Sequence, residues 1–235
     1  MNAYLAEFIG TSLLILLGDG VVANVLLKKS KGENSGWIVI TMGWAMAVFV
    51  GVFCVARYSG AHLNPAITLA LALAGKFPWV KVIPYILAQL AGAMLGAILV
   101  FLSYSRHFQQ TDNPDMIRAV FCTTPNIRHG LSNMITEIIG TFVLVFAALY
   151  LSVPDIGLNS INALPISLVV LAIGLSLGGP TGYAINPARD LGPRIVHALL
   201  PIPNKGDSDW KYSWVPILGP TIGAMLAAGV YALLS

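Results

Sequence analysis

Two copies of the tripeptide Asn-Pro-Ala carry the clearest chemical signal in this chain. The residues are Asn64, Pro65 and Ala66, and then Asn186, Pro187 and Ala188. Asparagine caps a helix and proline suits its first turn, so each copy predicts a helix start. The asparagine amides can donate hydrogen bonds to a passing hydroxyl or water, and carbonyls of the preceding loops can accept them. Bond-breaking chemistry is not indicated, because no nucleophile has a base at motif spacing.

The composition identifies the environment of these motifs. The 235 residues are 57% hydrophobic and 10% charged, whereas soluble domains are about 25% charged. The chain is therefore predicted to be an integral membrane protein. Its net charge of +3 is small and scattered, which argues against nucleic acid as a partner. Cys54 and Cys122 have no metal-ligand spacing, so we expect no metal or cofactor, and the apolar run around Cys54 predicts a buried thiol.

Six apolar segments are long enough to be spanning helices, which need about 20 residues. They are Tyr4–Leu27, Trp37–Ala56, Val82–Tyr104, Leu131–Leu151, Ile161–Leu177 and Trp214–Leu234. Two shorter stretches, Asn64–Ala74 and Asn186–Leu199, each begin at an Asn-Pro-Ala and are predicted to be re-entrant half-helices. The expected fold is an all-α membrane protein that forms a single domain over residues 1–235.

The two halves of the chain repeat. Ala6–Thr11 is similar to Thr136–Thr141, and Gly92–Ala97 is similar to Gly219–Ala224. The repeats cover approximately residues 1–104 and 131–235, joined by the loop 105–130. Three spans per repeat place the second copy upside down, so the half-helices enter from opposite faces and meet at the midplane. Irregular backbone at this depth is tolerated where it lines a cavity, which predicts a pore or binding site.

These motifs resemble those of the aquaporin and glycerol-facilitator channels over essentially the whole chain. The resemblance rests on the doubled Asn-Pro-Ala, the Ser59–Ala66 loop and the repeated Glu-Phe/Ile-Ile-Gly-Thr. It implies a passive channel for glycerol and other small neutral solutes, with some water permeability and exclusion of ions and protons. It also implies a homotetramer in the cell membrane, with both termini in the cytoplasm.

The resemblance places four residues at a selectivity filter: Trp44, Gly174, Tyr183 and Arg189. Water-selective members have histidine at the Gly174 position, so glycine is expected to leave space beside the apolar wall of Trp44. Asp190 is typical of the glycerol branch, and the run from Gly182 onward is most similar to glycerol facilitators of Gram-positive bacteria. Those channels usually have phenylalanine where Tyr183 stands, and some of that branch pass undissociated lactic acid or dihydroxyacetone. A structural ion pair of Arg189 with Asp190 is the alternative role for that arginine.

Intramembrane acids keep a second class of transporter open. Glu7 and Glu137 occupy equivalent repeat positions. They can couple proton movement in a secondary active transporter, or they can accept backbone N–H bonds from the re-entrant loops. His62 can brace the first loop or relay protons. Asp19 has no partner that the sequence identifies, and either lines a vestibule or marks an interrupted helix end.

The distribution of basic residues disagrees with the orientation that the resemblance implies. With cytoplasmic termini, Arg57, Lys76 and Lys81 flank the inner side. The outer side carries the larger set, which is Lys28, Lys29, Lys31, Arg106, Arg118, Arg128, Lys205 and Lys211. The positive-inside rule favours the reverse orientation.

Overall fold

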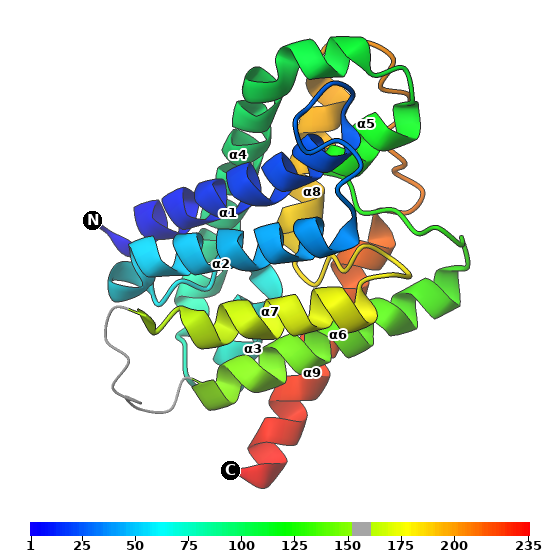
Figure 1. The fold of residues 1–235 in the computed structure, drawn as a ribbon. Coiled ribbons are helices and arrows are strands. Elements are labelled where there is room, and N and C mark those ends of the chain that lie inside the picture. The colour runs from blue at the N-terminus through cyan, green and yellow to red at the C-terminus, as the bar shows by residue number, and fades with distance from the viewer. Residues whose placement is uncertain (152–160) are drawn as a thin grey trace.

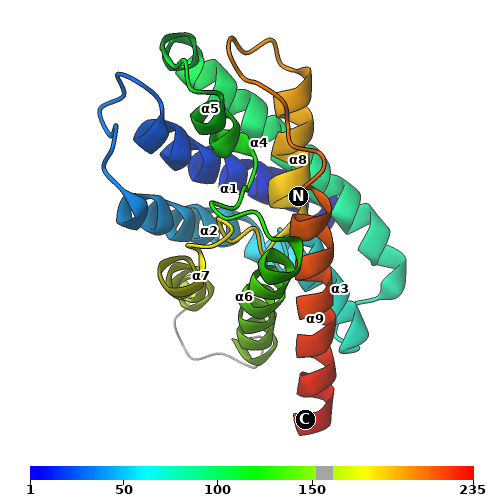
Figure 2. The ribbon, with the colours of Figure 1, turned by 90° about the vertical axis from the view of Figure 1, so that its right-hand side faces the viewer.

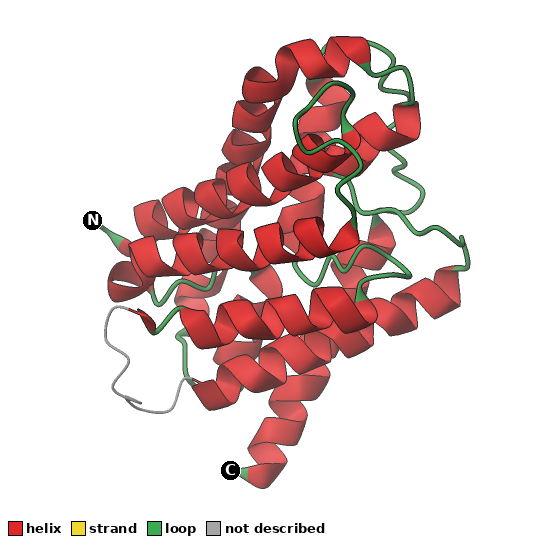
Figure 3. Ribbon diagram, viewed as in Figure 1, coloured by secondary structure: helices red, strands yellow, loops and turns green. Residues whose placement is uncertain are grey.

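The computed structural model describes residues 1–151 and 161–235, and these parts of the chain are helices and loops without strands (Figure 3). The helices are α1 (Ala3–Leu26), α2 (Trp37–Ser59), α3 (Pro65–Leu73), α4 (Val82–Gln110), α5 (Pro114–Phe121), α6 (Gly130–Leu151), α7 (Leu164–Leu177), α8 (Pro187–Leu199) and α9 (Trp214–Leu234). A short 3-10 turn, Trp79–Lys81, leads into α4.

Five of the predicted spans are helices that are long and apolar enough to cross a membrane, namely α1, α2, α4 with its preceding turn, α6 and α9. The remaining span, predicted at Ile161–Leu177, is represented by the 14 residues of α7. The half-helices begin at Pro65 and Pro187, directly after the asparagines, as the sequence predicts.

The helices pack as two equivalent halves. In the first half α1 contacts α4 and α2 extensively, and in the second α6 contacts α9 and α7 (Figures 1 and 2). The halves are joined by α2 against α7 and by an exchange of half-helices: α3 packs on α9, and α8 packs on α4. Each half-helix is therefore held mainly by a span of the other repeat.

Glycine permits the closest of these contacts. A Cβ atom added at Gly92 of α4 would lie 2.3 Å from the Phe8 carbonyl oxygen of α1. The repeat-equivalent glycines Gly96 and Gly223 are similar, because an added Cβ would lie 2.6 Å from the Ser12 carbonyl oxygen of α1 and 2.4 Å from the Ile138 carbonyl oxygen of α6. Small residues let spans approach backbone to backbone, and here they do so at corresponding places in both halves.

The sequence prediction needs two corrections. The third span, predicted to end at Tyr104, continues as α4 to Gln110, and the connection 105–130 contains α5, whose N-cap Asn113 accepts hydrogen bonds from Asp115 and Met116. Cys54 is exposed on α2 instead of buried. An apolar run in a membrane protein faces lipid as readily as protein, so the sequence around Cys54 could not separate the two.

Candidate functional site

The site is built where the two half-helices begin. Asn64 and Asn186 are buried N-caps whose Oδ1 atoms accept hydrogen bonds from the backbone N–H groups of Ala66 (2.8 Å) and Ala188 (3.0 Å). Pro65 and Pro187 occupy the first helical turn, where a missing N–H is no loss. The positive ends of both helix dipoles therefore lie beside these two asparagines.

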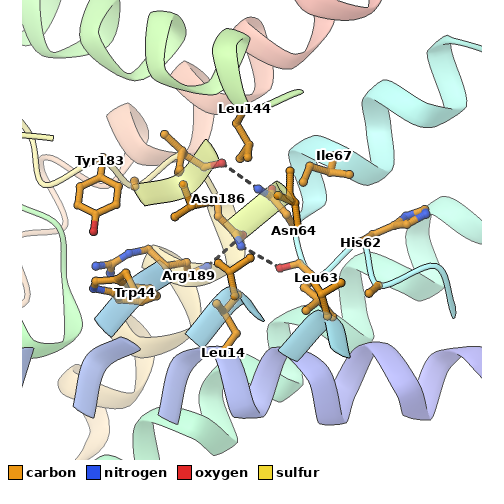
Figure 4. Close-up of a pocket in the computed structure, with 17 residues that line it drawn as sticks. Leu14, Trp44, His62, Leu63, Asn64, Ile67, Leu144, Tyr183, Asn186 and Arg189 are labelled. Carbon is orange, nitrogen blue, oxygen red and sulfur yellow. Dashed lines mark hydrogen bonds between the residues drawn. The ribbon is translucent and has the colours of Figure 1, made fainter. Parts of the chain in front are cut away.

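The asparagine amides also join the two loops reciprocally. Nδ2 of Asn64 donates to the Ile185 carbonyl, and Nδ2 of Asn186 donates to the Leu63 carbonyl, both at 2.8 Å (Figure 4). An amide nitrogen carries two N–H groups. One N–H of each asparagine is thus used between the loops, and the second makes no hydrogen bond to the described residues.

Both loops have the same unusual backbone. The residues four, three and one before each asparagine have positive φ angles: Gly60 (83°), Ala61 (50°) and Leu63 (51°) in the first loop, and Gly182 (80°), Tyr183 (39°) and Ile185 (45°) in the second. Non-glycine residues in this region cost of order 1–3 kcal/mol each and persist where their surroundings fix them. The same pattern in both loops indicates a required carbonyl arrangement.

Two buried glutamates fix these loops. Oε1 of Glu7 accepts from the His62 backbone N–H (3.0 Å) and the Ser59 hydroxyl (2.6 Å), and Oε2 accepts from the Leu63 N–H (2.7 Å). Gln89 of α4 donates a further bond of 2.8 Å to Oε2.

Glu137 makes the corresponding contacts in the second half. It accepts from the Ala184 N–H (3.0 Å), the Ile185 N–H (2.9 Å) and the Thr181 hydroxyl (2.7 Å). Each carboxylate accepts hydrogen bonds from its loop on both oxygens, which is the arrangement of a structural anchor, and neither glutamate lines the cavities described below.

Several carbonyl oxygens of the two loops have no hydrogen-bond donor in the described part of the chain. Within the described residues, the carbonyl oxygens of Gly60, Ala61 and His62 accept no hydrogen bond, and those of Gly182, Tyr183 and Ala184 accept none. Unpaired carbonyls are acceptors for water or a hydroxyl.

His62 lies at the opposite end of the site from the arginine (Figure 4). Its Nδ1 is 3.1 Å from the Thr68 hydroxyl of α3, and its ring packs on Phe77 and Tyr85 with centroid separations of 4.6 and 5.0 Å. The tyrosine hydroxyl in turn donates to the Ser59 carbonyl at 3.0 Å. These contacts brace the first loop.

Two cavities meet at three side chains. An inner cavity of about 70 Å³ contains both asparagines and is lined by His62 and the loop residues. A second cavity of about 270 Å³ lies towards α5 and the loop 122–126. Trp44, Tyr183 and Arg189 line both cavities and therefore form the constriction between them. Figure 4 shows these three side chains together at one end of the first cavity.

The Tyr183 ring lies beside Gly174. We expected this glycine to leave room for solute, but the residues lining the two cavities do not include it. A Cβ at Gly174 would lie 3.0 Å from Cζ of Tyr183, so the tyrosine ring occupies the space that glycine leaves. Trp37, which the sequence analysis missed as a site residue, donates to the Gly174 carbonyl (3.0 Å) and packs edge-on against Tyr183.

The arginine of the constriction is not paired with its neighbour in sequence. The Arg189 guanidinium lies over the Trp44 ring, 4.2 Å from its centroid, and Nη1 makes no hydrogen bond to the described residues. Asp190 binds Arg194 instead, with bonds of 2.7 and 2.8 Å, and accepts the Thr123 N–H and hydroxyl. The alternative of an Arg189–Asp190 ion pair is therefore wrong, and Asp190 anchors the loop after α5 to α8.

The fold and the site define a class of protein: a multi-pass membrane protein with a helical repeat and a narrow cavity where two half-helices begin. The model of the major intrinsic protein family matches residues 1–231. The chain therefore belongs to the major intrinsic protein family, whose members transport solutes and are not enzymes.

Individual relatives agree with this family. The chain is 60% identical over 231 residues to the probable glycerol uptake facilitator protein of Thermotoga maritima, covering 98% of each chain. It is 56% identical over 233 residues to the glycerol uptake facilitator protein of Streptococcus pneumoniae, covering 99% of each. The X-ray structure of the aquaglyceroporin from Plasmodium falciparum matches with a TM-score of 0.87 and 30% identity, over 97% of this chain and 94% of that one. The predicted fold class is confirmed by this similarity.

Glu137→Gln tests the anchoring of the second loop. The amide replaces one acceptor oxygen by a donor, which leaves loop N–H groups unpaired at about 1–3 kcal/mol each. We expect a clear loss of thermal stability of the purified protein in detergent, measured by fluorescence-detected unfolding. Glu33→Gln is the matched control, because Glu33 lies in a surface loop and binds Lys28 and Lys29. Equal stability of the two variants would contradict the anchoring role.

Proposed function

We propose that this protein is a passive channel for glycerol and other small neutral solutes, with some water permeability. The observation that carries the proposal is the constriction of Trp44, Tyr183 and Arg189 between two cavities. Relatives at 60% and 56% identity bear the name glycerol uptake facilitator, and the similar solved structure is an aquaglyceroporin. The whole chain, residues 1–235, forms one channel domain in this proposal.

The proposed path matches the two sides of a linear polyol. At the constriction the Trp44 and Tyr183 rings take the C–H side of the solute, and the Arg189 guanidinium takes its O–H side. The six unpaired loop carbonyls then accept hydrogen bonds from the solute. In the centre the second N–H groups of Asn64 and Asn186 donate to it. A neutral polyol exchanges its hydration for these partners at each step.

Ions are excluded by the same elements. The helix N-termini at Asn64 and Asn186 each present roughly half a positive elementary charge in a low-dielectric setting, and this field repels cations and protons. Glu7 and Glu137 hold loop donors and do not face the path, which argues against a proton-coupled active transporter. Passive conduction needs no such carboxylate.

Glycerol conduction is tested in proteoliposomes. Vesicles that carry the protein should shrink in hyperosmotic glycerol and reswell much faster than protein-free vesicles, measured by stopped-flow light scattering. Parallel runs with water, dihydroxyacetone and lactic acid rank the solutes, because the Gram-positive resemblance leaves them as alternatives. Reswelling in glycerol at the rate of protein-free vesicles would refute glycerol as the solute. Accumulation of solute against its gradient when a proton gradient is applied would indicate active transport.

Gly174→Val tests the proposed filter. The added methyl groups meet the Tyr183 ring and push it towards the path. A displaced ring that adds about 1.4 kcal/mol to the barrier for glycerol lowers the rate tenfold. We therefore expect glycerol permeability to fall roughly tenfold, with a smaller loss for water. Gly229→Val is the control, since a Cβ there meets nothing within 4 Å and Gly229 lines neither cavity. Equal losses for glycerol and water would refute the assigned geometry.

We also propose a homotetramer in the cell membrane with both termini in the cytoplasm, on the basis of the family resemblance. The loop 27–36 then faces outward with Lys28, Lys29 and Lys31. Light scattering of the detergent-solubilised protein should give a protein mass four times that of the 24.9-kDa chain. A membrane-impermeant amine reagent applied to intact cells should label these lysines; labelling only after lysis would favour the opposite orientation.

A further inference from the structure

Asp19 of α1 is a buried acid that the proposed path does not use. Its side chain has no exposed surface, and neither carboxylate oxygen makes a hydrogen bond to the described residues. Asp19 also lies outside the lining of both cavities. A buried carboxylate without hydrogen bonds is costly and needs a specific reason to be there.

The arginine of the constriction supplies that reason. Oδ1 of Asp19 is 3.9 Å from Nη1 of Arg189, an ion pair between side chains that are 0% and 8% exposed. The same guanidinium also lies over the face of the Trp44 ring. The tight approach of α1 secures this arrangement, because a Cβ at the preceding Gly18 would lie 2.2 Å from the Trp44 ring.

The other nearby acid is already occupied. Asp190 makes two hydrogen bonds to Arg194 and accepts two from Thr123. Arg194 also donates to the Ser208 and Asp209 carbonyls, so that pair belongs to the loop scaffold. Among the described residues, Asp19 is thus the acid that is paired with Arg189.

We propose that Asp19 is the counter-ion of the filter: it balances the charge of Arg189 and orients the guanidinium, so that the filter accepts neutral polyols and does not retain anions. Asp19 acts through Arg189 and is a positioning residue, not a contact of the solute. Without this charge, the guanidinium becomes an uncompensated cation in a narrow, poorly solvated passage, where carboxylates bind it by charge-assisted hydrogen bonds. An anion held there blocks the path.

Anion block of glycerol flux tests this proposal. The full-length protein and Asp19→Asn are compared in proteoliposomes at neutral pH, in sodium formate and in sodium chloride of equal osmolarity. Formate is the probe because it is a small planar carboxylate that can bind guanidinium through two oxygens. The unmodified protein should show the same glycerol permeability in both salts. In Asp19→Asn, formate should lower permeability roughly tenfold relative to chloride, the lower end of what a hydrogen bond between charged groups contributes.

Controls separate the charge effect from misfolding. Asp115→Asn changes a surface acid that pairs with Arg118 and should behave as the unmodified protein does. Asp19→Ser is a second, smaller neutral variant and should be as sensitive to formate as Asp19→Asn. The proposal is overturned if folded neutral variants are insensitive to formate, or if the unmodified protein is already inhibited by it.

This inference rests on the proposed glycerol conduction, and the experiment distinguishes the two. Fast glycerol reswelling of the unmodified protein with formate-insensitive Asp19 variants refutes the counter-ion alone. Absence of glycerol flux in the unmodified protein refutes the proposed solute, and the formate comparison is then made on water permeability, which passes the same constriction.

Discussion

Everything in this structure depends on the requirement that backbone polar groups inside a membrane find partners. The half-helices α3 and α8 leave two stretches of irregular backbone at membrane depth, and the protein treats donors and acceptors differently. Glu7 and Glu137 take up the N–H groups of the loops. The loop carbonyls that remain unpaired are the acceptors that we propose for the solute. Because the buried carboxylates bind the loop N–H groups, the loop carbonyls are left free for solutes in the proposed channel.

In the proposed channel, the central asparagines and the constriction have separate roles. Asn64 and Asn186 tie the two repeats together and present one donor each, a symmetric arrangement that suits any hydroxylated solute. The constriction has no such symmetry. Trp44 comes from α2, Tyr183 from the loop before α8 and Arg189 from α8 itself, and α1 contributes Asp19 behind them. In the proposed channel, discrimination between solutes thus arises where the two repeats have diverged.

The starts of the half-helices could be predicted from the sequence, because an N-cap followed by proline is a local signal. Asn-Pro pairs mark the starts of α3 and α8, and the same signal at Asn113 marks α5, which was overlooked. Side-chain contacts between elements that are far apart in the sequence could not be predicted. That Tyr183 fills the space of Gly174, or that Asp19 reaches Arg189, follows from helix contacts that no spacing reveals. The exposure of Cys54 was equally hidden, because core and lipid-facing positions are both apolar.

The reciprocal asparagine bonds have a consequence for biosynthesis. Asn64 and its acceptor Ile185 are 121 residues apart, so the partner of the first loop does not yet exist when that loop leaves the ribosome. At a translation rate of about 5–20 residues per second, the first repeat waits on the order of ten seconds. During this interval Glu7 and Gln89, both already synthesised, are the groups that can shelter the nascent loop. The hydrogen bond from Gln89 to Glu7 thus lies in the first repeat, which is synthesised first and waits for the second.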